Sequence, residues 1–146
     1  NDLFTASKGQ GAFLNDRRIR VSKKNKMRDA LIGTGFPFRD FKYLSDYLKI
    51  LEDIIVNTSG VRRPGAAALD LAYVAAGWLD GFWEIGLSKW DIAAGGLIVR
   101  EAGGIVSDFS EKQDWLESGN IICSNPYIYE PFIRLVQKRL PKELKN

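Results

Sequence analysis

Residues 90–104 read WDIAAGGLIVREAGG, an apolar, small-residue segment of helical length with a carboxylate near its start. Gly103 and Gly104 are typical of a helix end, because glycine adopts the left-handed conformation that closes many helices. Asp91 is expected at the N-cap, where a carboxylate accepts unpaired N–H groups of the first turn and is favoured by the helix dipole. By itself this pattern predicts a capped helix and says nothing about chemistry.

Length and composition predict one globular domain with a buried core, because the chain has 146 residues and 45% apolar content. The 21 basic residues exceed the 18 acidic ones by only three. The basic residues concentrate in two runs, Arg17–Lys26 and Lys138–Lys145. We interpret both runs as solvated surface, since no aromatic residues are interleaved with them; a nucleic-acid or partner surface is the alternative.

The absence of histidine excludes several classes of catalyst. Ser-His-Asp and Cys-His systems need an imidazole, and so do most zinc sites. Chemistry in this chain therefore depends on carboxylates, backbone N–H groups and hard cations such as Mg²⁺. Cys123 is the single cysteine, and its apolar surroundings predict a buried strand in a reducing compartment. No run of 18 apolar residues and no signal peptide is found, so we expect a cytoplasmic protein without a membrane partner.

The alternation of apolar runs and amphipathic segments from residue 30 onward predicts an α/β fold, layered as in α+β proteins, with a largely parallel sheet flanked by helices. Tight turns before residue 30 predict a small strand meander. The expected strands are 3–6, 11–14, 17–21, 30–35, 60–62, 78–85, 105–107 and 120–123. The expected helices are 41–56, 66–76, 90–104 and a last one that starts at 125–126 and ends at Pro141.

Three motifs occur in one order along the chain, and they carry a family resemblance. They are Gly65-Ala66-Ala67-Ala68, then Glu84-Ile85-Gly86, then the Trp-Asp segment with its trailing Glu-Ala-Gly-Gly. Together with 3–6 (LFTA) and 9–15 (GQGAFLN), they resemble the inositol monophosphatase family, especially its bacterial extragenic-suppressor (SuhB-type) members. The resemblance runs from residue 1 to about residue 136. It implies the carboxyl-terminal half of the layered α/β/α/β/α fold of sugar phosphatases.

The resemblance implies Mg²⁺-dependent hydrolysis of a phosphate monoester by an activated water. Asp91 matches the aspartate that binds the second Mg²⁺, beside the leaving-group oxygen, which makes it the candidate catalytic residue and metal ligand. Glu84 matches the carboxylate that accepts hydrogen bonds from ring hydroxyls. Gly65 and Ala67 match positions whose backbone approaches the ring, as small residues at a helix start permit. Taken alone, Gly65 also fits a simple turn and Glu84 a solvated strand end.

One part of the family pattern has no counterpart in this sequence. The remaining metal ligands, a glutamate and an Asp-Pro-x-Asp-Gly-Thr/Ser loop, belong upstream of Asn1, and the only Asp-Gly pair, Asp80-Gly81, lacks a preceding Asp-Pro. Two-metal hydrolysis needs several carboxylates around the phosphate. We therefore expect residues 1–146 to be the carboxyl-terminal part of such a phosphatase, with the upstream metal-binding half absent and with no activity in the isolated chain.

Several functions remain open at this point. The leading one is hydrolysis of D-myo-inositol 1-phosphate, with Mg²⁺ as cofactor, inhibition by Li⁺, and a homodimer, as the resemblance implies. A fructose 1,6-bisphosphate or adenosine 3′,5′-bisphosphate phosphatase is a rival, although a carboxylate such as Glu84 would repel a second phosphate. A regulatory module that contacts transcription machinery or RNA is a hypothesis of a different class. A structural half-domain without activity is the last.

Overall fold

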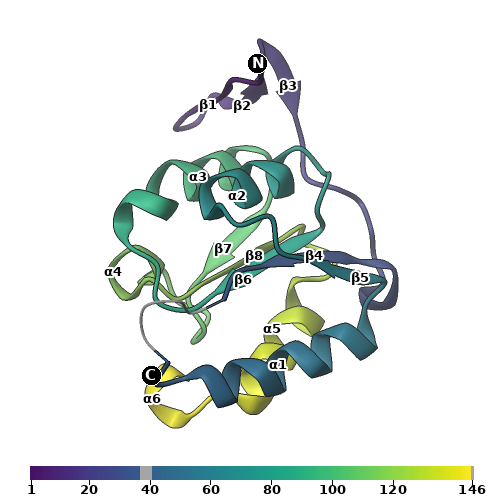
Figure 1. Cartoon of the computed structure of the whole chain (residues 1–146). Helices are drawn as coiled ribbons and strands as arrows, with labels where there is room; N and C mark the ends of the chain where they lie inside the picture. The colour runs from purple at the N-terminus through teal and green to yellow at the C-terminus, as the bar shows by residue number, and fades with distance from the viewer. Residues whose placement is uncertain (37–40, 146) are drawn as a thin grey trace.

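The computed structural model describes residues 1–36 and 41–145, and its elements form two sheets and two groups of helices (Figure 1). The first sheet is an antiparallel meander of β1 (Phe4–Ser7), β2 (Gly11–Leu14) and β3 (Arg17–Ile19). The second has the strand order β5-β4-β6-β8-β7. Its strands are β4 (Leu31–Thr34), β5 (Gly60–Arg62), β6 (Gly81–Glu84), β7 (Ile105–Ser107) and β8 (Ile121–Ser124). The helices are η1 (Met27–Asp29), α1 (Leu44–Asn57), α2 (Ala67–Ala75), α3 (Lys89–Glu101), α4 (Trp115–Ser118), α5 (Tyr129–Arg139) and α6 (Lys142–Lys145).

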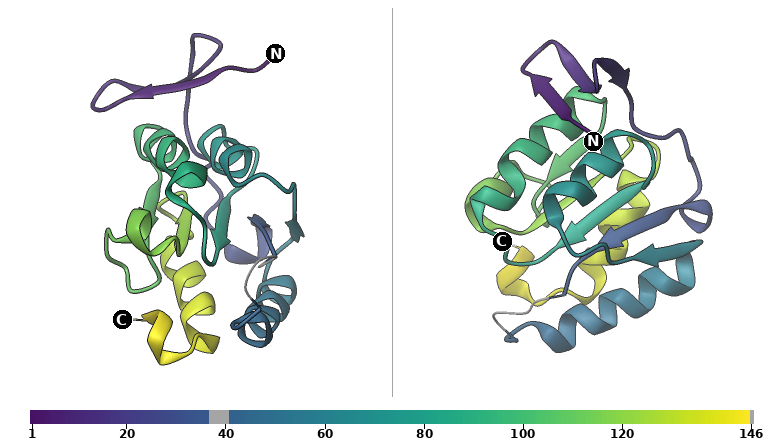
Figure 2. Two further views of the ribbon diagram at one scale, coloured as in Figure 1. Left: turned by 60° about the vertical axis from the view of Figure 1, so that its left-hand side comes forward. Right: turned by 45° about the horizontal axis from the view of Figure 1, so that its top comes forward.

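These elements stack in four layers. The meander lies outermost over α2 and α3, the five-stranded sheet follows, and α1 and α5 cover its other face (Figures 1 and 2). The predicted α/β fold with helices on a sheet is confirmed. The order sheet, helices, sheet, helices also matches four consecutive layers of the expected α/β/α/β/α arrangement.

The five-stranded sheet is mixed, and β8 is the reason. Strand β4 is parallel to both β5 and β6, whereas β8 is antiparallel to both β6 and β7. Four of the five strands described here therefore point the same way, as predicted, and β8 runs against them. The connection from β7 to β8 contains the short helix α4 and returns the chain antiparallel beside β7.

The core divides into two clusters, one on each face of the five-stranded sheet, and β6 contributes side chains to both. Successive strand residues point to opposite faces, so Phe82 packs toward α2 and α3 while Trp83 packs toward α1 and α5. Both side chains are fully buried. Cys123 on β8 is a buried free thiol in the first cluster, as its apolar surroundings predicted, and burial raises the pKa of this thiol.

Several element boundaries differ from the predicted ones for local reasons. Helix α5 begins at Tyr129 rather than at residue 125, because Asn125 Oδ1 accepts the N–H groups of Tyr127 and Ile128 and closes a turn first. Strand β6 begins at Gly81 rather than at residue 78, because the chain first completes the end of α2, where the N–H of Trp78 donates to the carbonyl of Tyr73. Helix α1 begins at Leu44, about one turn later than predicted. The short helices η1, α4 and α6 were not predicted.

The trailing Glu-Ala-Gly-Gly of the Trp-Asp segment ties the meander to α3. The Glu101 carboxylate accepts the N–H groups of Gly9 and Gly11 at 3.0 and 2.9 Å, and these hydrogen bonds lower the pKa of this carboxylate. The carbonyl of Ala102 accepts the N–H of Val21. This part of the motif is therefore structural: it holds the turn between β1 and β2, and the chain that follows β3, against the helix end.

Glycine permits the close approach of α2 and α3. A Cβ added to Gly95 of α3 would lie 2.7 Å from Leu71 Cβ of α2, closer than real side chains pack. A Cβ added to the neighbouring Gly96 would meet the ring of Trp115. The two glycines thus set the distance from α3 to its neighbours, and with it the position of Asp91 at the start of α3.

We expect Gly95→Val to lower the free energy of unfolding by about 1–3 kcal/mol, because the added side chain would force α2 and α3 apart. Ala93→Val changes an exposed residue of the same helix to valine and serves as the matched control. Its expected cost is below about 1 kcal/mol, from helix propensity alone. Urea unfolding followed by circular dichroism measures both variants. Equal losses in the two variants would contradict the packing argument.

Candidate active site

A cavity of about 690 Å³ opens where the carboxyl ends of β4 and β6 meet the first turns of α2 and α3. The four residues predicted from the sequence, Gly65, Ala67, Glu84 and Asp91, all line it. They come from three separate segments of the chain, so the tertiary structure brings them together. The complete lining is Gly35, Phe36, Tyr43, Arg63, Gly65, Ala66, Ala67, Ala68, Asp70, Glu84, Ile85, Gly86, Leu87, Ser88, Asp91, Ser118, Asn120 and Leu144.

Asp91 lies in the first turn of α3, and its prediction as the N-cap is wrong. The N-cap is Ser88, whose backbone is extended (φ −81°, ψ 159°), and Asp91 is the third helical residue. Its Oδ2 accepts hydrogen bonds from the Ser88 backbone N–H at 3.2 Å and from the Ser88 hydroxyl at 2.8 Å. The bond from the Ser88 N–H belongs to a capping box, in which the side chain of the third helical residue reaches back to the N-cap. Both bonds use Oδ2, and the exposed Asp91 side chain borders the cavity.

Glu84 is the last residue of β6, and its carboxylate is half-buried in the cavity wall. Burial, together with the nearby Asp70 and Asp91, raises the pKa of Glu84 to about 7, and Arg63 acts in the opposite direction. The carboxylate lies directly against Gly35, where any side chain would clash with both carboxylate oxygens. Gly35 therefore makes room for Glu84, a role that the sequence alone did not indicate.

Small residues form the wall where α2 begins. Gly65 has φ +95°, a left-handed conformation that glycine adopts without strain. Ala66 is the extended N-cap, and α2 starts at Ala67. The first N–H groups of a helix lack partners within the helix. Gly65 and Ala67 therefore place small side chains and a helix start in the wall of the cavity.

Asp70 is a cavity residue that the sequence analysis missed. It lies on α2 and is 1% exposed, and its Oδ1 has no hydrogen-bond partner among the described residues. Burial raises the pKa of Asp70 to about 7. The sequence did hold a signal: Asp70 is the only charged residue in the otherwise apolar segment 66–76, on a helix that packs into the core. Asp70, Glu84 and Asp91 give the cavity an acidic lining.

Arg63 supplies positive charge beside these carboxylates. It lines the cavity, and its guanidinium lies 4.4 Å from the centre of the Phe36 ring. In the part of the chain that the structure describes, no group of three or more histidine, cysteine, aspartate or glutamate side chains is arranged to hold a metal ion. A complete metal centre at this cavity would need ligands in addition to Asp91. No helix among the described residues is long and apolar enough to span a membrane.

The raised pKa of Asp70 predicts a pH dependence of stability. The folded-state pKa of about 7 lies above the unfolded value of about 3.9, so the folded chain binds more protons between these limits. Stability therefore falls as the pH rises from about 4 to about 7. Asp70→Asn removes this loss, and we expect the variant to be more stable than the parent by about 1–3 kcal/mol at pH 8 and equal to it at pH 4.

Urea unfolding at pH 4, 6 and 8 measures this difference. Glu52→Gln neutralises an exposed carboxylate on α1 and is the control, with no change in pH dependence expected. A destabilised Asp70→Asn variant at pH 8 would show instead that the charged carboxylate stabilises the fold.

The fold and the cavity define a class of protein: a layered α/β chain whose acidic, glycine-rich cavity lies at strand and helix ends. Comparison with known proteins identifies this class. The inositol monophosphatase family model matches residues 1–140. The chain therefore belongs to the inositol monophosphatase family.

Individual relatives agree with this assignment. The chain is 52% identical over 145 residues to the Nus factor SuhB of Pseudomonas aeruginosa, an alignment that covers 98% of this chain and 54% of that protein. It is 49% identical over 140 residues to the inositol-1-monophosphatase of Mesorhizobium japonicum, covering 96% and 53% of the two. The chain thus spans about half the length of the curated relatives that it matches.

Solved structures show the same fold. The crystal structure of the extragenic suppressor protein SuhB from Bartonella henselae has a TM-score of 0.91 at 48% identity, over 95% of this chain and 53% of that one. The inositol monophosphatase from Anabaena has a TM-score of 0.89 at 34% identity, over 98% and 57% of the two chains.

Proposed function

We propose that this chain supplies the ring-binding wall and one metal ligand of a Mg²⁺-dependent phosphatase acting on inositol monophosphate. One observation carries the proposal: Glu84, Asp91 and the glycine-alanine start of α2 line one cavity. Family membership and the inositol-1-monophosphatase relative support a phosphate ester as substrate. The whole activity needs carboxylates that the described residues do not supply, so the chain by itself is expected to be inactive.

Glu84 would bind the polyol ring. An ionised carboxylate has only acceptor sites and suits a ligand rich in hydroxyl donors. Burial, Asp70 and Asp91 oppose the ionised form of Glu84, whereas Arg63 favours it. The same carboxylate would repel a second phosphate, which favours an inositol monophosphate over a sugar or nucleoside bisphosphate. The backbone donors at Gly65 and Ala67 would contact ring oxygens from the neighbouring wall.

Asp91 would hold Mg²⁺, since carboxylate oxygens are the ligands that this hard cation prefers. The hydrogen bonds from Ser88 hold Oδ2 in place, and Asp91 lines the cavity. When bound, Mg²⁺ stabilises negative charge on the leaving-group oxygen. The chain has no histidine and its one cysteine is buried, so zinc is not expected to replace Mg²⁺. Inhibition by Li⁺ belongs to this proposal.

A second candidate function rests on the relatives' names. The Pseudomonas aeruginosa relative is a Nus factor at 52% identity, which supports a role in contacting transcription machinery or RNA. This role would use the outer surface and need not involve Asp91. Binding that persists in an Asp91→Asn variant would favour it over catalysis as the function of this chain.

The role of Asp91 is tested in a chimera in which this chain replaces the matching 140 residues of the Mesorhizobium japonicum inositol-1-monophosphatase. We expect Asp91→Asn to lower kcat for inositol 1-phosphate about 10²-fold or more with little change in KM, because charge stabilisation of the leaving group is lost. Asp114→Asn removes an exposed carboxylate outside the cavity and should leave kcat unchanged. EDTA should abolish the activity and Mg²⁺ should restore it. An unchanged kcat in a folded Asp91→Asn chimera would leave Asp91 with its capping role alone.

The role of Glu84 is separated from chemistry by comparing two substrates of the same chimera. Glu84→Gln keeps the shape but weakens charge-assisted hydrogen bonds to hydroxyls, each worth about 1.5–3 kcal/mol. We expect kcat/KM for inositol 1-phosphate to fall about ten- to a hundredfold. The value for a simple aryl phosphate, which has no ring hydroxyls, should change little. Equal losses on both substrates would assign Glu84 to the fold or to the metal site instead.

A further inference from the structure

The adjacent ends of the two basic runs meet in a groove. Lys26 ends the first run and Lys138 begins the second, and both line a surface groove of about 750 Å³. The groove lies between η1, the end of α1 and the outer face of α5, and no described residue lines both this groove and the carboxylate cavity. Its lining is Lys26, Met27, Arg28, Asn57, Pro131, Arg134, Leu135 and Lys138.

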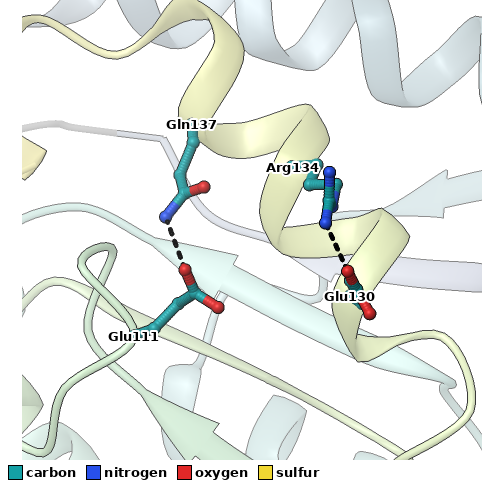
Figure 3. Close-up of polar contacts among 4 residues, drawn as sticks. All are labelled: Glu111, Glu130, Arg134 and Gln137. Atoms are coloured by element: carbon teal, nitrogen blue, oxygen red, sulfur yellow. Dashed lines mark hydrogen bonds and ion pairs between the residues drawn. The ribbon is translucent and has the colours of Figure 1, made fainter.

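The rim of the groove is cationic. Lys26, Arg28, Arg134 and Lys138 are all exposed, and none of the described lining residues is acidic. Arg134 forms an ion pair with Glu130 one turn earlier on α5 (Figure 3). Both side chains are about 70% exposed, and such an exposed pair contributes little stabilising free energy. On the same helix, Gln137 donates instead to the carbonyl of Phe109 and to Glu111, away from the groove (Figure 3).

The floor of the groove is apolar. Met27, Pro131 and Leu135 form it, and Met27 also packs against the core cluster under α1 and α5. Water covers this apolar surface in the free chain, so a ligand with its own apolar side chains gains by displacing it. A phosphate backbone offers no such side chains, and the described lining holds no aromatic ring on which a base could stack.

We propose that this groove is a docking site for an acidic, amphipathic segment of a partner protein. Apolar side chains of the segment would contact Met27, Pro131 and Leu135, and its carboxylates would lie against Lys26, Arg28, Arg134 and Lys138. The cationic rim would raise the association rate and align the segment, while the apolar floor would supply the contact area. The proposal is independent of the phosphatase function, because the two sites share no residue.

The test is an NMR titration of the isotopically labelled chain with a short synthetic peptide in which Asp and Glu alternate with Leu. Amide shifts are expected at residues 26–28 and 131–138. Lys26→Glu combined with Lys138→Glu should weaken binding about tenfold or more. The matched control, Lys8→Glu combined with Arg17→Glu, makes the same change of charge on the distant meander (Figure 1) and should alter affinity less than about twofold. The amide spectra of both variants verify that they fold.

Two further ligands distinguish the possible occupants. A peptide with Ser in place of Leu and a uridine oligonucleotide of equal charge should both bind about tenfold more weakly than the Leu peptide. Equal binding of all three would reduce the groove to a general polyanion surface and overturn the proposal. Tighter binding of the oligonucleotide would make the site an RNA surface. Shifts of the same amides with chain concentration alone would assign the groove to a second copy, and absence of binding by the Leu peptide would also overturn the proposal.

Discussion

The alternating burial of Phe82 and Trp83 in β6 is the constraint on which the rest of the structure depends. β6 is the central strand of the five-stranded sheet, and each of these rings enters a different core cluster. Trp83 stacks on Tyr47 of α1 with ring centres 4.7 Å apart. A strand held on both faces cannot slip by one residue without exchanging the two cores. Its register therefore fixes Glu84, the next residue, at the carboxyl end of β6, where the cavity opens.

Partly buried hydrogen bonds connect the start of β6 to the segment that leads from the meander to β4. Asp80, just before β6, accepts the N–H of Leu31 at 2.7 Å and the hydroxyl of Ser22. Asn125 donates to the same hydroxyl at 2.9 Å and to the carbonyl of Lys24. Asp80 belongs to the only Asp-Gly pair in the sequence, and its bonds give that pair a structural role. The segment between the meander and β4 is thereby anchored to the strand ends of the large sheet.

The cavity brings acidic side chains together in a place where burial opposes their ionisation. Asp70, Glu84 and Asp91 gather negative charge in a partly dry space, where burial already disfavours ionised carboxylates. Keeping these carboxylates charged and partly buried costs free energy in the unliganded protein. A ligand that brings hydroxyl donors or positive charge reduces this cost. A polyol phosphate together with a divalent cation has both properties. The electrostatic cost and the proposed function are thus consistent with each other.

The sequence by itself determined the local features of this protein. Tight turns and periodicity identified the meander and the main helices, apolar neighbours predicted the buried Cys123, and the ordered motifs predicted the family that the comparisons confirmed. The four proposed site residues were also chosen from motifs, and they share one cavity. Each motif consists of residues close together in the chain, where pattern and conformation are directly linked, whereas their meeting in one cavity is a result of the tertiary structure.

Only the tertiary structure decided the rest, because it depends on residues far apart in the chain. The direction of β8, the burial of Asp70 and the contact of Gly35 with Glu84 follow from packing between distant segments. The Ser88 N-cap is an exception, because its capping box with Asp91 joins residues three apart and the Ser-x-x-Asp spacing already encodes it. Lys26 and Lys138 line one groove because η1 and α5 lie together, although the two residues are widely separated in sequence. Local periodicity carries no information about such long-range juxtapositions.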